Sequence, residues 1–309
     1  MKPILVTSYV GPDIDGTASA IAYAEYLVST GKEAVAGLLG TPHEEARFVL
    51  DRFDLEYPNI IDDAEEYDQI VLADASDLAG LGGRVPAEKV IEIIDHRRIN
   101  DTASFPNAEV QIELVGAAAT LVAERFLRDG IDISKHAAIL IQSAIISNTL
   151  NMKGSVTTDR DREVVEKLST IYTLSDGYWR ELFASKSDLS GGRLQERIRG
   201  DFATFELGGK RIGIAQIEML EGEKLVRERG EEIVRELEVL KSEMGLDIVF
   251  QSTIELEDAR NIFVAPDDNA RQLLEAVFSI QFNGIVAERS DALMRKQIVP
   301  LLKKVLETK

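Results

Sequence analysis

The sequence predicts a two-domain α/β protein, in which a parallel β-sheet with helices on both faces is followed by a smaller α/β domain. Three observations predict this fold class. The chain has 309 residues, more than one domain usually contains. Short apolar runs alternate with segments of helical spacing in the first half, which is typical of a parallel sheet. A polar, glycine-bearing stretch at residues 186–192 then indicates a linker.

The first domain is expected to span residues 1–187. Its strands are predicted from short apolar runs, and its helices from apolar residues that recur at helical spacing. Gly and Pro mark the boundaries between them. In chain order, the expected strands are residues 4–8, 33–39, 69–73, 89–94 and 110–114, and the expected helices are residues 17–27, 42–53, 116–126, 136–148 and 159–172.

The second domain is expected to span residues 193–309, after a linker at residues 188–192. It begins with a predicted hairpin whose turn contains Gly208-Gly209. A long helix follows, and because its charge pattern is that of a solvated surface, we assign it no chemistry. The expected elements are strands at residues 203–207, 211–217, 247–253 and 261–265, and helices at residues 221–244, 268–278 and from residue 297 onwards.

The composition of the chain limits its partners. With 54 acidic and 35 basic residues, its formal net charge of −19 disfavours general binding to nucleic-acid phosphates. No apolar run approaches the roughly 20 residues of a membrane span, and the N-terminus lacks the pattern of a secretory signal. We therefore expect a cytoplasmic protein without a membrane segment. Because the chain has no cysteine, the candidate metal ligands are carboxylates and its three histidines.

Acidic residues and one histidine follow three of the predicted strands. Asp13 and Asp15 come after the first strand, Asp74 after the third, and Asp95-His96 after the fourth. The carboxyl ends of parallel strands share one edge of the sheet, so these side chains are expected to meet. Carboxylates with one imidazole suit Mn²⁺ or Mg²⁺. Each residue alone has a simpler interpretation, as a helix cap, a turn residue or a structural histidine, but their joint occurrence favours a metal site.

Four short segments carry these residues or follow them along the chain. They are residues 9–15 (YVGPDID), 72–74 (LAD), 94–98 (IDHRR) and 143–148 (SAIISN). Their order and spacing resemble the four motifs of the DHH phosphoesterase superfamily. Over essentially its whole length, the chain is most similar to the manganese-dependent family II inorganic pyrophosphatases. Further segments extend this resemblance: residues 115–120 (VGAAAT), 157–161 (TTDRD), 205–208 (FELG), 214–217 (IAQI) and 295–300 (RKQIVP).

The resemblance implies an activity and a set of site residues. It implies a DHH domain that binds one or two Mn²⁺ or Mg²⁺ ions, and a DHH-associated C-terminal domain that binds phosphate. The expected reaction is hydrolysis of a small phosphorylated substrate such as pyrophosphate, which yields two phosphates, and the expected assembly is a homodimer. The implied metal ligands are Asp13, Asp15, Asp74, His96 and Asn148, and the implied phosphate-binding residues are Arg295 and Lys296.

Several positions depart from the family pattern. Tyr9 stands where the first motif has a histidine, Arg97 where the third has its second histidine, and Asn148 where the fourth ends in a bridging aspartate. An amide cannot supply the negative charge that holds two cations together. In the second domain, Ala203 replaces a phosphate-binding lysine, and a Ser-Arg-Lys-Lys run becomes residues 293–296 (LMRK). These departures predict reduced or altered activity, because loss of one transition-state donor costs roughly 10²–10³ in rate.

Arg97 is the departure that could change the chemistry. Its permanent planar charge could pair with Asp13 or a substrate phosphate where a metal is missing, or it could be a solvated surface side chain. We assign catalytic roles to Asp13, Arg97 and Asn148, and a substrate-binding role to Arg97 as well. The leading function is hydrolysis of a phosphoanhydride or phosphoester. The alternative is a phosphate- or nucleotide-binding regulatory protein of the same fold, with weak or no activity.

Overall fold

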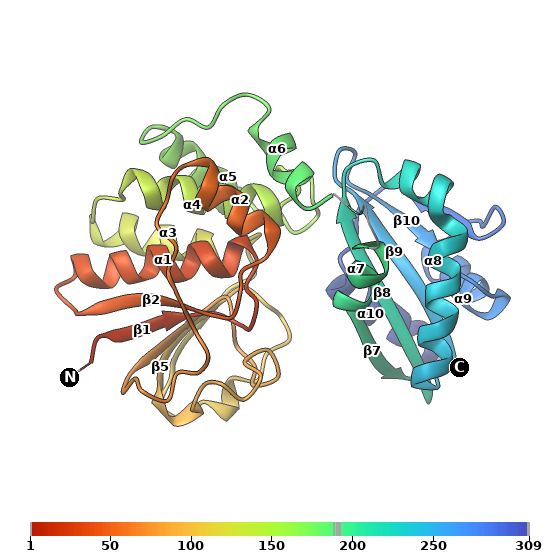
Figure 1. The fold of residues 1–309 in the computed structure, drawn as a ribbon, viewed down its shortest axis with the longest axis horizontal. Helices are drawn as coiled ribbons and strands as arrows, with labels where there is room; N and C mark the ends of the chain where they lie inside the picture. Colours follow the sequence, from red (N-terminus) through yellow and green to blue (C-terminus); the bar gives the residue numbers. More distant parts are fainter. Residues whose placement is uncertain (1, 188, 190–192, 308–309) are drawn as a thin grey trace. The chain divides into compact units, whose positions relative to one another are not determined.

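The computed structural model describes residues 2–187, 189 and 193–307, and the chain divides into two compact units (Figure 1). The first unit comprises residues 1–152 and 156–185, and the second comprises residues 153–155 and 186–309. Of the predicted linker at residues 188–192, all but Leu189 lies outside the described residues. Leu189 itself belongs to a hydrophobic core of the second unit.

The first unit contains a six-stranded sheet in which every pair of neighbours is parallel, as the sequence predicts. Its spatial order is β3-β2-β1-β4-β5-β6. β1 and β4 are buried along their whole length, which explains why both are continuous apolar runs. The strands are β1 (Ile4–Thr7), β2 (Ala34–Leu39), β3 (Asn59–Ile61), β4 (Ile70–Ala73), β5 (Val90–Asp95) and β6 (Glu109–Ile112).

The direction of the sheet changes between β1 and β4. From β1 the chain proceeds outward to β2 and β3, and then returns to add β4, β5 and β6 on the other side of β1. At such a point the segments that leave two adjacent strands diverge and open a crevice outside their carboxyl ends, where ligands bind in open α/β sheets. The topology therefore brings together the acidic residues that follow β1, β4 and β5.

The two faces of this sheet are covered differently. α1 contacts β1, β2 and β4 on one face and packs against α3 and α4. On the other face, a core that includes Leu5, Leu72, Leu81 and Phe105 contains no residue of an α-helix. Instead of the helices expected on both faces, short 3₁₀ turns and irregular connections cover this one. The helices of the unit are α1 (Ile14–Ser29), α2 (Glu44–Arg52), α3 (Ala118–Asp129), α4 (Lys135–Asn148), α5 (Asp159–Ser169) and α6 (Tyr178–Ser185), with 3₁₀ turns η1 (Ala87–Lys89) and η2 (Thr102–Ser104).

The second unit is a five-stranded mixed sheet in the order β11-β10-β9-β8-β7. The predicted hairpin is the antiparallel pair β7–β8, while α8 connects β8 to its parallel neighbour β9. β10 and β11 extend the sheet by antiparallel pairing. The strands are β7 (Phe202–Leu207), β8 (Lys210–Met219), β9 (Ile248–Glu255), β10 (Arg260–Val264) and β11 (Val286–Arg289), and the helices are α7 (Arg193–Gly200), α8 (Gly222–Met244), α9 (Asp268–Phe278) and α10 (Arg295–Glu307).

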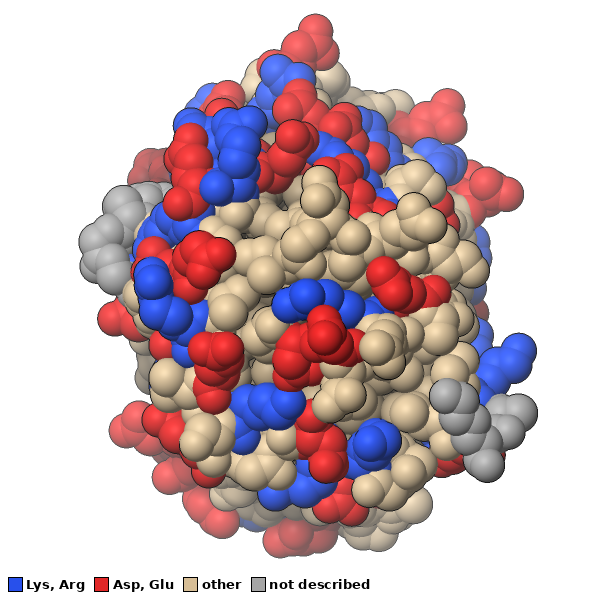
Figure 2. Space-filling view, turned by 90° about the vertical axis from the view of Figure 1, so that its right-hand side faces the viewer, with Lys and Arg blue, Asp and Glu red and all other residues tan. Residues whose placement is uncertain are grey.

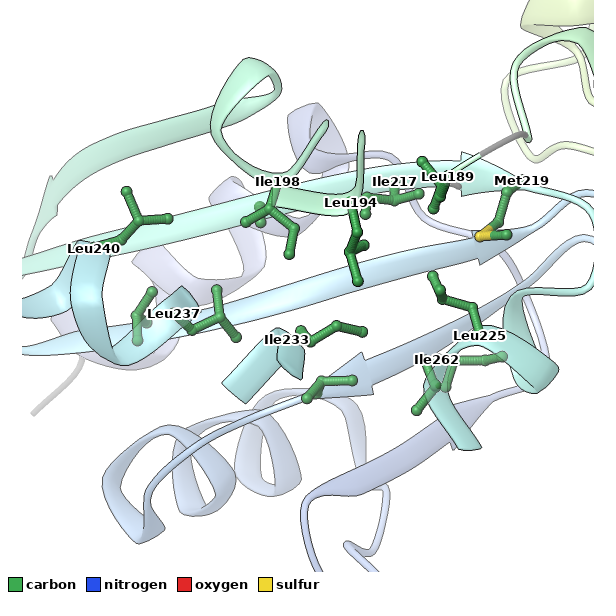
Figure 3. Packing of buried hydrophobic residues seen from close by; sticks show 14 of the residues in the cluster. Leu189, Leu194, Ile198, Ile217, Met219, Leu225, Ile233, Leu237, Leu240 and Ile262 are labelled. Carbon is green, nitrogen blue, oxygen red and sulfur yellow. The ribbon is translucent and has the colours of Figure 1, made fainter. Parts of the chain in front are cut away.

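Alternate residues of β8 supply two cores on opposite faces of this sheet. Ile217 packs with α7 and α8, and Figure 3 shows Leu194 of α7 and Ile233 of α8 in the same core. Ile212 and Ile214 belong to the other core, with residues of α9 and α10. The period of two along a strand produces this division.

Charged side chains of both signs are distributed over the surface. On the face drawn in Figure 2, Lys and Arg are interspersed with Asp and Glu and form no continuous basic field. Within the residues that the structure describes, no helix has the length and apolar character required to cross a membrane.

Candidate metal centre

Asp13 ends the loop after β1 and begins α1. Its Oδ1 accepts a hydrogen bond from the backbone N–H of Gly16 at 3.0 Å, so Asp13 is the N-cap that the sequence left as an alternative. The helix consequently starts at Ile14, three residues before its predicted start. The first turn of α1 packs closely against Ser8. Only glycine fits at position 16, because a Cβ atom there would lie 2.5 Å from the Oγ of Ser8.

Asp15 is a fully buried carboxylate inside the first turn of α1. It accepts hydrogen bonds from the backbone N–H groups of Ala118 (2.8 Å) and Ala119 (2.9 Å) at the start of α3, and from the Oγ of Ser19 (3.3 Å). Burial, together with the charge of Asp13, raises the pKa of Asp15 to about 7, although the N–H groups of Ala119 and Ala118 act in the opposite direction. The hydrogen bonds therefore hold the Asp15 carboxyl group in place, but they do not offset the cost of burying its charged form.

Asp74 lies directly after β4 in a left-handed backbone conformation, with φ of 59°. Its N–H donates to the carbonyl oxygen of Ile94, which fixes the chain at this strand end. The carboxylate is 2% exposed, and among the described residues its Oδ1 has no hydrogen-bond partner. Burial raises the pKa of Asp74 well above its usual value, and Asp15 raises it further while Arg97 opposes the shift. A buried carboxylate oxygen without a hydrogen bond is costly unless nearby positive charge offsets it.

His96 follows β5 and completes a cluster with the two carboxylates. Its Nδ1 lies 3.0 Å from the carbonyl oxygen of Val115, and since a carbonyl only accepts, Nδ1 carries the proton in this contact. Nε2 then faces Asp74 Oδ1 at 3.5 Å and Asp15 Oδ2 at 3.8 Å. In the described part of the chain, Asp15, Asp74 and His96 form a group whose ligand atoms all lie within 4.8 Å of one another. Three residues that follow three different strands thus converge, as the sequence predicted.

Arg97 lies beside this cluster and is not a solvated surface side chain. Its Nη2 donates to the backbone oxygen of Asp74 at 3.0 Å, and its side chain is 29% exposed. Its ion pairs are with Asp74, Asp77 and Asp95 (3.7, 3.7 and 3.9 Å) instead of Asp13, whose carboxylate caps α1. The Tyr9 ring centroid lies 5.0 Å from the guanidinium carbon.

Asn148 ends α4 and points its amide at Asp15. The Nδ2 group donates to Asp15 Oδ2 at 2.7 Å, so the side chain acts here as a neutral hydrogen-bond donor. Tyr9 is occupied in a similar way, since its hydroxyl oxygen accepts a hydrogen bond from the backbone N–H of Asp13 at 3.0 Å. Two positions that the resemblance assigns to metal ligands therefore make hydrogen bonds within the first unit.

Asp161 fixes the loop that precedes α3. The sequence indicated this residue only through the resemblance of residues 115–120 and 157–161. Asp161 accepts hydrogen bonds from the N–H of Gly116 (2.9 and 3.0 Å) and the hydroxyl of Thr120 (2.6 Å), and it forms a capping box with Thr158. Residue 116 must be glycine, because a Cβ atom there would lie 2.4 Å from Thr149 Cγ2. These contacts hold the loop whose N–H groups bind Asp15.

In the second unit, one of the two residues expected to bind phosphate is held by contacts within the unit, and the other is exposed to solvent. Arg295 is tied to Asp201, with 2.5 Å from Nη2 to the carboxylate and 2.7 Å from Nη1 to the backbone oxygen. Its N–H donates to Gln216 Oε1 at 2.6 Å. Lys296 is exposed. Ala203 lies on β7 and offers no charge.

Comparison with known proteins supports the resemblance that the sequence motifs indicate. Residues 180–305 match the model of the DHHA2 domain. The chain is 29% identical over 308 residues to a probable manganese-dependent inorganic pyrophosphatase of Clostridium acetobutylicum, which covers 99% of both chains. Over its whole length the chain is thus similar to manganese-dependent inorganic pyrophosphatases. It is also 29% identical over 303 residues to a manganese-dependent inorganic pyrophosphatase of Methanothrix thermoacetophila, with 97% of both chains covered.

Solved structures show the same similarity in the fold. A putative family II inorganic pyrophosphatase of Methanococcus jannaschii superimposes with a TM-score of 0.79 at 27% identity, and the match covers 99% of this chain and 100% of that one. An exopolyphosphatase-related protein of Bacteroides fragilis has a TM-score of 0.53 at 13% identity, covering 99% and 92%, and shares the fold. The predicted fold class and resemblance are confirmed.

The donor set of this chain fits a divalent ion. Two carboxylates and an imidazole are suitable ligands, and one of their oxygens, Asp74 Oδ1, accepts no hydrogen bond from the described residues. Three residues beside this group, at positions where the resemblance places metal ligands, make other contacts. Tyr9 offers a phenol already bound to the backbone, Arg97 a positive charge, and Asn148 an N–H donor.

Proposed function

We propose that this chain is a divalent-metal-dependent hydrolase of phosphoric anhydrides, with pyrophosphate as its simplest substrate. The observation that carries the proposal is the buried group of Asp15, Asp74 and His96 at the switch point of the sheet, in which Asp74 Oδ1 has no hydrogen-bond partner among the described residues. The relatives named as manganese-dependent inorganic pyrophosphatases support Mn²⁺ as the ion and pyrophosphate as the substrate.

Each residue of the group has a defined task in this proposal. Asp15 and Asp74 would hold the ion through carboxylate oxygens, and His96 through Nε2, since its Nδ1–H is committed to Val115. When bound, the ion supplies Lewis acidity toward a phosphoryl oxygen and lowers the pKa of water. Arg97, next to the group, carries the positive charge that a substrate phosphate requires. Asp13 positions Asp15 by starting α1.

The rate is expected to be lower than that of a site with a full set of cations. Developing charge on a transferring phosphoryl group is stabilised by preorganised positive groups, and the loss of one such donor costs roughly 10²–10³ in rate. Ala203 provides no such group, and Asn148 cannot hold an ion as a carboxylate does.

A second candidate is a phosphate- or nucleotide-binding regulatory protein with little hydrolysis. The observation that favours it is the state of Arg295, whose guanidinium is bound to Asp201 and to backbone carbonyls. A cation bound within its own unit is less available for stabilising a transition state.

A phosphate-release assay in Mn²⁺ separates the two functions. It compares pyrophosphate, short polyphosphates, nucleotides and short oligonucleotides, each with and without a chelator. We expect Mn²⁺-dependent release from pyrophosphate. Absence of turnover with every substrate, together with micromolar binding of phosphate or a nucleotide, would instead establish the regulatory function.

The affinity for Mn²⁺ should depend on pH. Protons and the ion compete for Asp15, whose pKa is raised by burial to about 7, and for Asp74, whose pKa is raised as well. Affinity should therefore increase as pH rises, by about tenfold per unit for each proton displaced, until both carboxylates are ionised. Calorimetric titrations between pH 6 and pH 8 measure this slope. Equal dissociation constants at the two ends would contradict it.

A further inference from the structure

We propose that Arg97 is an internal counter-ion that competes with the divalent metal ion for Asp74, and thereby lowers the affinity of the site for the metal. The proposal rests on the proposed metal site. It concerns what sets the affinity of that site, and not which substrate it hydrolyses.

The guanidinium of Arg97 is positioned to share Asp74 with a metal ion. Its Nη2 lies 3.7 Å from Asp74 Oδ1, the oxygen that is 3.5 Å from His96 Nε2 and has no hydrogen-bond partner among the described residues. The same nitrogen donates to the backbone oxygen of Asp74 at 3.0 Å. An ion bound to Oδ1 and the guanidinium would therefore be two positive charges on one carboxylate, in a site shielded from water.

Arg97 is fixed in this position from three sides. Asp77 and Asp95 lie 3.7 and 3.9 Å from its other nitrogens, and Asp95 is fully buried. The Tyr9 ring lies against the guanidinium, and the hydroxyl of Tyr9 is held by the N–H of Asp13. A side chain restrained in this way cannot swing into solvent without losing several contacts, so its charge stays beside Asp74.

Arg98, the neighbour of Arg97 in the sequence, offers a comparison for the effect of a buried charge. Arg98 is the next residue in the chain and carries the same charge, but it is exposed. Asp74 and Asp15 are both buried, so the charge nearest to them matters most. Arg98 therefore provides a matched control for the loss of one arginine.

The test compares Mn²⁺ binding in the full chain and in Arg97→Met, Arg97→Lys and Arg98→Met. We expect Arg97→Met to bind Mn²⁺ about 10- to 100-fold more tightly than wild type, the range in which neighbours of metal ligands alter affinity. Arg97→Lys retains the charge and should stay close to wild type, as should Arg98→Met. The metal-free melting temperature of Arg97→Met should fall, because buried carboxylates lose their counter-ion, and added Mn²⁺ should restore it.

The outcomes separate this inference from the proposed function. A folded Arg97→Met chain with unchanged or weaker Mn²⁺ affinity overturns the inference, even if wild type hydrolyses pyrophosphate. Tighter Mn²⁺ binding in Arg97→Met, without phosphate release from any substrate, supports the inference and defeats the proposed function. If Arg97→Met does not fold, Tyr9→Leu replaces it, because loss of the ring frees the guanidinium. Tyr9→Leu should tighten binding in the same direction, and an unchanged affinity in that variant also overturns the inference.

Discussion

Replacement of Asp74 by asparagine is expected to abolish Mn²⁺-dependent phosphate release and to weaken Mn²⁺ binding by at least about 100-fold. Asp74 supplies the carboxylate oxygen that faces both His96 Nε2 and the Arg97 guanidinium. An amide has the same shape but no charge, so the variant keeps the volume of the side chain and loses the ligand. Titration with Mn²⁺ and the phosphate-release assay measure the two effects.

The fold should survive this substitution. Asn is among the few residues that tolerate a left-handed backbone, which position 74 requires. Folding raises the pKa of Asp74, so its contribution to stability is present below the unfolded value of 3.8 and is lost as pH rises through the folded value. At pH 8 without metal, Asp74→Asn should therefore melt no lower than wild type. A large drop in melting temperature would show that the variant lost function by unfolding.

Asp77→Asn is the matched control for this experiment. Asp77 lies as close to Arg97 as Asp74 does, but it is outside the group of metal ligands and its Oδ1 accepts the N–H of Gly80. The control should bind Mn²⁺ far more tightly than Asp74→Asn, with only a small loss relative to wild type, because it removes a neighbouring charge and no ligand. Equal losses in both variants would mean that the site depends on the charge around Arg97 and not on the ligand set.

The centre of the site could be predicted from the sequence because topology determines it. Asp15, Asp74 and His96 each follow an apolar run, and the carboxyl ends of parallel strands meet at one edge. Sequence spacing alone could not distinguish ligands from caps. In the first motif, Asp13 caps α1, and Asp15, two residues later, lies in the candidate ligand group; the role of Asp13 as a ligand stays a prediction.

The supporting contacts could not be predicted, because they join residues far apart in the chain. The bonds from Ala118 and Ala119 to Asp15, and from Gly116 to Asp161, cross more than 40 positions. The packing of Arg97 on Tyr9 depends on rotamers that are set only when the sheet has formed. The strands β3 and β11 were also missed, since neither is a continuous buried apolar run like β1 and β4.

Restoring the family pattern at three positions is expected to convert the site from one bound Mn²⁺ to two. The variant combines Tyr9→His, Arg97→His and Asn148→Asp. It replaces a phenol, a fixed positive charge and an amide donor by two imidazoles and a carboxylate, all placed around the candidate ligands Asp15, Asp74 and His96. Pyrophosphate turnover should rise by at least about 100-fold, because each added cation stabilises charge on the transferring phosphoryl group.

The metal content of the purified variant, measured in excess Mn²⁺ and again after dialysis, decides this prediction. Arg98→His alone is the control, since it adds an imidazole at an exposed position beside the same motif. That chain should retain the wild-type stoichiometry. An occupancy of one ion or none in the triple variant would mean that these three positions do not surround a second metal position, and that the correspondence between this chain and the pyrophosphatase motifs is wrong there.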